Sequence, residues 1–162
     1  MENIIVLGIG NRLMMDDGIG IYLTEELSKQ NPTSHVSFLI GESDIDYSLD
    51  LIMKATFVII VDAVYSGKKT GDVTVFPLAN LHEYQNLDIS AHNFHLFQAL
   101  YQQKSSIKGY LIGVEPDEVK FHIGLSQTLS EKWITILHDV SKAIDSLIAK
   151  YCSSLDLNVP SD

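Results

Sequence analysis

The chain has 162 residues, which is close to the size of one domain of roughly 150 residues. Its 21 Asp and Glu residues outnumber its 11 Lys and Arg residues, so its formal net charge is −10 at pH 7. Phosphate backbones and anionic lipids repel so acidic a chain, and we therefore expect it to bind neither nucleic acid nor membranes. With 46% hydrophobic residues the chain can bury a real core, which excludes a disordered protein.

Cysteine usage and the start of the sequence indicate the compartment. Cys152 is the only cysteine, which excludes an intrachain disulfide and a multi-cysteine metal site. The chain begins Met-Glu-Asn and continues into an apolar segment, without the basic start and cleavage site of a signal peptide. No apolar run reaches the roughly 20 residues that a membrane-spanning helix needs. We therefore expect a cytoplasmic protein in which Cys152 is a half-buried packing residue.

Short segments rich in β-branched residues predict five strands. They are residues 4–7, 36–40, 57–61, 72–76 and 110–114. Continuous apolar runs such as 57–61 are typical of strands covered on both faces of a parallel sheet. The segment 72–76 instead alternates and follows a short turn that cannot hold a crossover helix. We therefore expect this strand to lie antiparallel at an edge.

Helical patterns lie between these strands. One carries Ile19, Leu23 and Leu27 on one face, one covers 47–55, one runs from its N-cap Ser90 to about residue 103, and one runs from Trp133 to Tyr151. The alternation of strands and helices predicts a three-layer α/β/α fold, with a mostly parallel five-stranded sheet and one antiparallel edge strand. We expect a single domain over residues 1–152 and a polar C-terminal tail over 153–162.

Acidic residues follow the first and third predicted strands. In such sheets ligands bind at the carboxyl ends of the strands, where the winding direction reverses. If the strand order is 2-1-3, the loops with Asp16, Asp17 and Asp62 meet there. Two adjacent carboxylates repel each other unless a proton or a metal ion lies between them. His92 near a helix N-terminus is a third candidate, because the helix dipole favours the neutral imidazole that binds metals.

Each candidate also has a structural interpretation. Asp16 or Asp17 could cap the helix that follows, and for Asp16 we favour capping or simple solvation. Asp62 could cap a turn, although an acid that closes a buried strand needs a compensating partner. His92 could donate to a backbone carbonyl. His95 lies one turn further along the helix and could share a metal, but a packing or solvent role is favoured.

Other catalytic classes fit less well. The turn at residues 8–10, Gly-Ile-Gly, is compatible with a dinucleotide site, but Leu13 stands where a third glycine would be. The acidic pair at 16–17 would repel a pyrophosphate, and Glu42 follows the second strand too late to bind a ribose. A tight turn that lets the next loop fold back explains these glycines better. The sequence also lacks a Gly-x-Ser-x-Gly elbow, a His-Glu-x-x-His helix and a Walker sequence.

Five short segments then form a recognisable pattern in chain order. They are Leu-Gly-Ile-Gly-Asn at 7–11 with Met-Asp-Asp-Gly-Ile-Gly at 15–20, Val-Asp-Ala-Val at 61–64, Ser-Ala-His at 90–92, Leu-Ile-Gly-Val-Glu-Pro at 111–116, and His-Ile-Gly-Leu-Ser at 122–126. Together they resemble the signatures of the hydrogenase maturation endopeptidases, which trim the large subunit of nickel–iron hydrogenases. The match extends from residue 3 to about residue 130.

The resemblance implies a site and a reaction. The family's three nickel-contacting positions fall on Asp17, Asp62 and His92, with no further catalytic group assigned. The implied enzyme recognises nickel already inserted in the large subunit precursor and removes a C-terminal extension from it. Nickel would thus be supplied by the substrate, no organic cofactor is expected, and the enzyme would act as a monomer. Carboxylate and imidazole ligands suit zinc and manganese as well as nickel.

Two departures from the family pattern leave alternatives open. The loop after the second strand is often glycine-rich in the family, but residues 41–46 read Gly-Glu-Ser-Asp-Ile-Asp here. His95 stands where the family often has glycine. Asp16, Glu42 and His95 are therefore possible accessory residues, and the substrate could come from a divergent hydrogenase. A nickel-binding chaperone and a general metallopeptidase with the same three ligands are the alternative functions.

Overall fold

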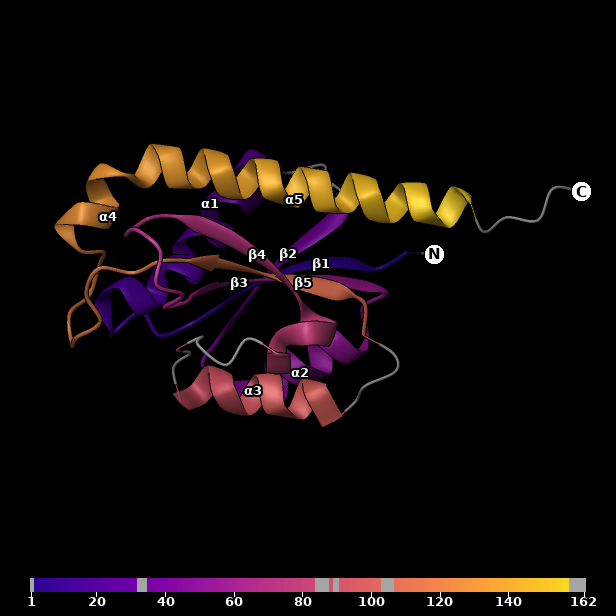
Figure 1. The fold of residues 1–162 in the computed structure, drawn as a ribbon, viewed down its shortest axis with the longest axis horizontal. Helices are drawn as coiled ribbons and strands as arrows, with labels where there is room; N and C mark the ends of the chain where they lie inside the picture. The colour runs from indigo at the N-terminus through magenta and orange to yellow at the C-terminus, as the bar shows by residue number, and fades with distance from the viewer. Residues whose placement is uncertain (1, 32–34, 84–87, 89–90, 103–106, 158–162) are drawn as a thin grey trace, which may run out of the picture.

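The computed structural model of the chain describes residues 2–31, 35–83, 88, 91–102 and 107–157. In chain order, the elements are β1 (Ile4–Ile9), the 3₁₀ turn η1 (Met15–Gly18), α1 (Ile19–Gln30), β2 (Val36–Glu42), α2 (Ile45–Met53), β3 (Phe57–Ala63), β4 (Val73–Pro77), the 3₁₀ segment η2 (Leu78–Glu83), α3 (Ala91–Gln102), β5 (Gly109–Val114), α4 (Gln127–Glu131) and α5 (Trp133–Asp156). Figure 1 shows their arrangement.

The five strands form one sheet in the order β2-β1-β3-β5-β4. The pairs β1–β2, β1–β3 and β3–β5 are parallel, whereas β4 pairs antiparallel with β5 at the edge. All residues of β1 and β3 are buried, in line with their continuous apolar runs. The antiparallel edge strand is thereby confirmed, and the order β2-β1-β3 meets the condition under which the acidic loops come together. Because β1 and β3 are adjacent and parallel, the loops that follow them begin at the same edge of the sheet.

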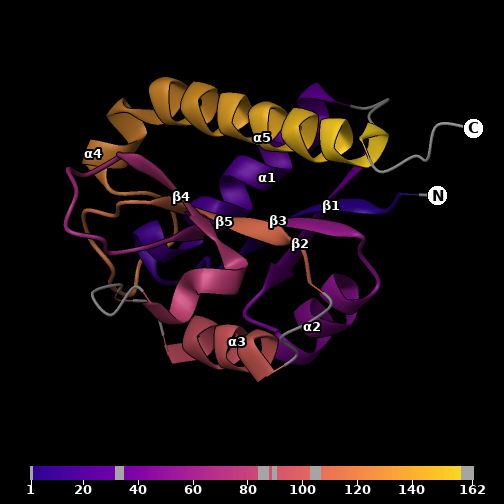
Figure 2. The same ribbon diagram turned by 45° about the vertical axis from the view of Figure 1, so that its right-hand side comes forward.

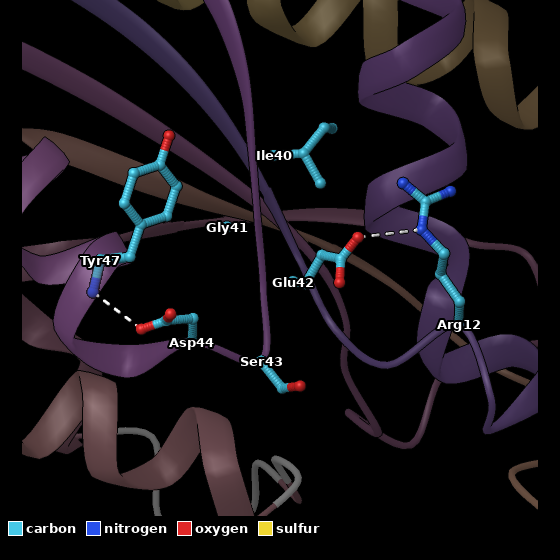
Figure 3. Close-up of a pocket in the computed structure, with 7 residues that line it drawn as sticks. All are labelled: Arg12, Ile40, Gly41, Glu42, Ser43, Asp44 and Tyr47. Atoms are coloured by element: carbon cyan, nitrogen blue, oxygen red, sulfur yellow. Dashed lines mark hydrogen bonds and ion pairs between the residues drawn. The ribbon is translucent and has the colours of Figure 1, made fainter.

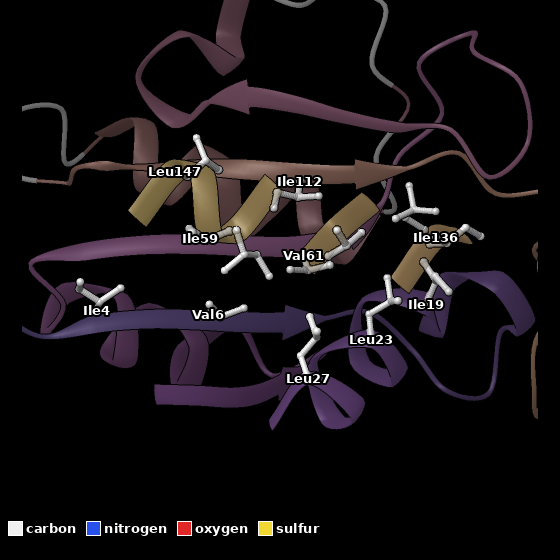
Figure 4. Close-up of a cluster of buried hydrophobic side chains, with 14 of the residues drawn as sticks. Ile4, Val6, Ile19, Leu23, Leu27, Ile59, Val61, Ile112, Ile136 and Leu147 are labelled. Carbon is white, nitrogen blue, oxygen red and sulfur yellow. The ribbon is translucent and has the colours of Figure 1, made fainter. Parts of the chain in front are cut away.

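Helices cover both faces of this sheet, which confirms the three-layer fold. Helices α1 and α5 lie on one face and α2 and α3 on the other (Figures 1 and 2). On the first face, Leu23 from α1 and Ile136 from α5 pack against Val6 and Val61 in the cluster shown in Figure 4. Each fully buried aliphatic side chain of this kind stabilises the fold by about 1.5–3 kcal/mol. A second buried cluster, which includes Ile52 from α2 and Leu96 from α3, covers the other face of the sheet.

Close backbone contacts explain two of the N-terminal glycines. Gly10 has a φ of 137°, and a Cβ there would lie 2.0 Å from the carbonyl oxygen of Asp17. A Cβ at Gly20 would lie 2.1 Å from the carbonyl oxygen of Val61. Only glycine therefore lets the loop after β1 fold back and lets α1 approach β3. The expected tight turn is confirmed, and it places Asp17 over the end of β1.

The C-terminal helix differs from the expectation. It continues to Asp156, past the expected boundary at residue 152, so the first part of the predicted tail is helical. Cys152 is exposed, so the expectation of a half-buried residue is wrong. Tyr151 stacks on Phe57 at a ring distance of 4.3 Å, and the next position along the helix turns away from that contact. Among the residues described, no helix is both long and apolar enough to cross a membrane.

Candidate active site

Asp17 lies in η1, at the carboxyl end of β1. Its side chain is only 7% exposed, and its Oδ2 accepts a hydrogen bond of 3.0 Å from the backbone N–H of Asn11. The close approach of Gly10 to the Asp17 carbonyl sets this turn. The carboxylate is thus held in place by the backbone of the same loop.

Asp62 is the second-last residue of β3 and is fully buried. Its Oδ1 accepts a hydrogen bond of 2.8 Å from the N–H of Ala63, and its Oδ2 accepts one from the side-chain amide of Asn93. Burial, and then the nearby carboxylate of Asp17, raise the pKa of Asp62 well above its ordinary value. The structure therefore brings the two predicted carboxylates together. Their mutual repulsion would be relieved by a proton or by a cation between them.

His92 belongs to the first turn of α3, but its side chain is outside the described residues, as is the expected N-cap Ser90. Asn93 is the next residue in this turn, is buried, and contacts Asp62. The start of α3 is thereby tied to the same edge of the sheet. Among the described side chains, no group of three or more His, Cys, Asp or Glu residues is placed to hold a metal ion. The assignment of His92 as a ligand stays a prediction.

Asp16 neither caps a helix nor faces solvent, so that expectation is wrong. It is fully buried, and its carboxylate accepts hydrogen bonds from the backbone N–H groups of Asp117, Glu118 and Ser126 at 2.7–2.9 Å. A buried carboxylate requires such donors, and three of them fix the loop between β5 and α4. Asp16 therefore holds the loop beside the site.

Glu42 lies at the exposed end of β2, in the left-handed region with a φ of 52°. Its Oε1 accepts a hydrogen bond of 3.2 Å from Nε of Arg12, whose guanidinium also pairs with Glu25. Arg12 and Glu42 border an open pocket of about 600 Å³, lined by Arg12, Ile40, Gly41, Glu42, Ser43, Asp44 and Tyr47 (Figure 3). The expected acidic loop is thus partly neutralised by Arg12.

His95 is exposed on α3, and its ring lies 6.1 Å from the ring of Phe94 at an interplanar angle of 68°. This position agrees with the favoured packing or solvent role. Whether His95 also binds a metal stays a prediction. Sequence reasoning missed Asn93 and Arg12. For Arg12 a signal existed, because it is the one basic residue in the loop that carries the acidic pair.

Comparisons with known proteins agree on one family. The family model described as hydrogenase maturation protease (HycI) matches residues 21–144. The hydrogenase 2 maturation protease of Escherichia coli is 28% identical over 147 residues, covering 87% of this chain and 90% of that protein. The hydrogenase 3 maturation protease of the same organism is 26% identical over 135 residues, covering 82% and 85%.

Solved structures show the same fold. The hydrogenase maturating endopeptidase HybD from E. coli superposes with a TM-score of 0.72 at 25% identity, covering 89% of this chain and 93% of that chain. HybD from Thermococcus kodakarensis, a NiFe hydrogenase maturation protease, gives a TM-score of 0.67 at 21% identity, covering 87% and 98%. The family match spans well over half of the chain. The chain therefore belongs to the hydrogenase maturation protease family of endopeptidases.

Proposed function

We propose that this protease removes a C-terminal extension from the nickel-loaded precursor of the large subunit of a NiFe hydrogenase. Membership of the family supports a protein substrate from hydrogenase maturation. The observation that carries the finer proposal is the pair formed by Asp17 and Asp62. Each is buried, burial and then the Asp17 carboxylate raise the pKa of Asp62, and both lie at the carboxyl edge of the sheet.

The chemistry of these donors fits nickel presented by a substrate. Asp17 and Asp62 offer carboxylate oxygens, and His92 would add an imidazole nitrogen, a donor set that is compatible with nickel, zinc and manganese. A divalent cation between the two carboxylates would relieve their repulsion. A precursor that carries nickel would therefore bind more tightly than an empty one. In this proposal, the repulsion between the carboxylates of Asp17 and Asp62 is what makes the protease select the nickel-loaded precursor over the nickel-free one.

Neighbouring groups in the chain orient these donor side chains. The N–H of Asn11 orients Asp17, and the side-chain amide of Asn93 orients Asp62. Before substrate binds, the raised pKa lets Asp62 keep a proton to a higher pH than an ordinary carboxyl does. Asp62 would release this proton to solvent on holding the cation of a loaded precursor, because metal ligands bind in their deprotonated form. We further propose that the enzyme acts in the cytoplasm as a monomer.

Mass spectrometry of the precursor tests this function. The parent chain is expected to shorten the nickel-loaded precursor by one C-terminal peptide. Asp62→Asn and His92→Ala should each lower the rate by roughly 100-fold or more without unfolding the protein, which circular dichroism checks. Asp139→Asn, at an exposed position of α5, is the matched control and should retain the parental rate. Binding of the precursor without any change in its mass would contradict the proposal and favour a nickel-binding chaperone.

A further inference from the structure

Large apolar side chains are exposed at one end of the molecule. Leu13 is 47% exposed, Val119 39%, Phe121 80% and Ile123 71%. Leu13 lies in the loop after β1, and the other three lie in the loop between β5 and α4, which projects at the end opposite the C-terminus (Figures 1 and 2). We call these four residues the apolar tip. Exposed large apolar side chains that gather in one place mark interaction sites more often than chance exposure does.

Backbone hydrogen bonds hold the two loops of the apolar tip together. The N–H of His122 donates to the carbonyl of Leu13, and the N–H of Met15 donates to the carbonyl of His122, both at 2.9 Å. The N–H of Asp16 donates to the carbonyl of Glu118 at 3.1 Å. The buried carboxylate of Asp16 fixes the second loop at both of its ends. The exposed side chains thus stand on an ordered backbone, and a preorganised surface loses little entropy on binding.

The apolar tip is continuous with the candidate active site. The segment that pairs with the second loop runs directly into Asp17, so Leu13 and Asp17 belong to one short loop. A protein whose metal is contacted by Asp17 must therefore lie over the same end of the molecule. Asp117 and Glu118 are exposed beside the tip, with Lys120 paired to Glu118 at 3.2 Å. Arg12, next to Leu13, pairs with Glu25 and Glu42, so the described charged groups around the tip are acidic on balance, as is the whole chain.

We propose that the apolar tip is the docking surface for the large subunit precursor. This inference rests on the proposed function and adds the surface that holds the substrate during cleavage. Phe121 and Ile123 insert into an apolar recess of the precursor, because central aromatic and aliphatic anchors carry most of the affinity of such interfaces. The rim of that recess is basic, which complements the acidic groups beside the tip.

Steady-state cleavage of the nickel-loaded precursor tests this surface. The double variant Phe121→Ser/Ile123→Ser is expected to raise KM by roughly tenfold or more, while kcat stays within about twofold. The conservative variant Phe121→Leu/Ile123→Val should have a KM much closer to that of the parent chain. Leu157→Ser is the matched control, because Leu157 is 86% exposed at the far end of α5 and should leave KM unchanged. The three side chains that these variants change are exposed, and thermal unfolding verifies that each variant folds.

The outcomes of this experiment distinguish a failure of the docking proposal from a failure of the proposed function. If the parent chain cleaves the precursor and the double variant has the parental KM, the docking proposal is wrong and the proposed function stands. If the parent chain neither binds nor cleaves the loaded precursor, the proposed function fails and the docking surface falls with it. If the parent chain is instead a dimer, and the double variant is a monomer with the parental KM, the apolar tip serves self-association and the proposal is wrong.

Discussion

The side-chain amide of Asn93 donates a hydrogen bond to Oδ2 of Asp62 and so ties the first turn of α3 to the carboxyl end of β3. Both side chains are buried. His92 precedes Asn93 in the same turn, so this bond also sets where the backbone of that turn lies relative to Asp62. Asn93 is therefore a positioning residue for the site.

Replacing Asn93 by Ala is expected to lower the free energy of unfolding by about 1–3 kcal/mol, because a buried carboxylate loses a donor. It should also raise the pKa of Asp62 further, since the bond from Asn93 lowers it in the native protein. Urea unfolding and carbon-13 NMR of the Asp62 carboxyl measure the two effects. The control Asn80→Ala, at an exposed position of η2, should change neither. An unchanged Asp62 pKa in the Asn93 variant would contradict the assigned contact.

The stability of the metal-free chain should depend on pH through Asp62. Burial and Asp17 raise its pKa in the folded state above the value of about 3.9 in an unfolded chain. The folded state therefore holds this proton more tightly, and the stability linked to it is complete below about pH 4 and is lost as the pH rises through the folded pKa.

Asp62→Asn removes this titration and nearly preserves the shape of the side chain. The variant is expected to be more stable than the parent chain at pH 7, and its advantage should grow from about pH 4 upward. Thermal unfolding midpoints at a series of pH values measure the difference, with Asp139→Asn as the exposed control. If the stability advantage of Asp62→Asn over the parent chain shrinks as the pH rises, the pKa of Asp62 is lowered in the folded state and the account is wrong.

Asp16→Ala is expected to be among the most damaging single substitutions in the chain. Three backbone N–H groups, of Asp117, Glu118 and Ser126, would lose their acceptor, at a cost of about 3 kcal/mol or more in total. The loop between β5 and α4 should also become sensitive to proteases, which mass mapping of the fragments detects. Asp145→Ala, at an exposed position of α5, is the control. Parental stability of the Asp16 variant would show that the loop is held by other contacts.

Gly10→Ala tests the turn that positions Asp17. The new Cβ would overlap the Asp17 carbonyl, and the φ of 137° is unfavourable for alanine, so we expect a loss of about 3 kcal/mol or more. Gly67→Ala is a matched control with a φ of 78° and no atom within 4 Å of the new Cβ. It should cost only about 1 kcal/mol. Equal losses in urea unfolding would show that backbone strain, and not contact with Asp17, decides the effect.

The character of each strand could be predicted from sequence, because burial and edge position follow from local patterns. The apolar runs of β1 and β3 differ from the alternating β4, and the short turn before β4 forces it to an antiparallel edge. The order β2-β1-β3 was not fixed by these patterns and is seen in the structure; with it, Asp17 and Asp62 meet at one edge of the sheet. The juxtaposition of the two carboxylates is therefore a consequence of topology.

The donors to Asp16 and the Asn93 donor to Asp62 could not be predicted, because they come from distant parts of the chain. The donors to Asp16 lie 101–110 residues away, and Asn93 lies 31 residues from Asp62. No local pattern distinguishes a buried carboxylate with backbone donors from a solvated one. For Cys152 the error was geometric, since the buried stripe of α5 passes through Tyr151 and not through its neighbour.

The central claim is that the protease selects its substrate by the nickel that the substrate carries. The most direct measurement is the rate of release of the C-terminal peptide from the large subunit precursor at increasing nickel occupancy, followed by mass spectrometry. We expect the rate to rise in proportion to occupancy and to be negligible for the nickel-free precursor. Equal cleavage of the nickel-free and fully loaded precursors would contradict the role given to Asp17 and Asp62.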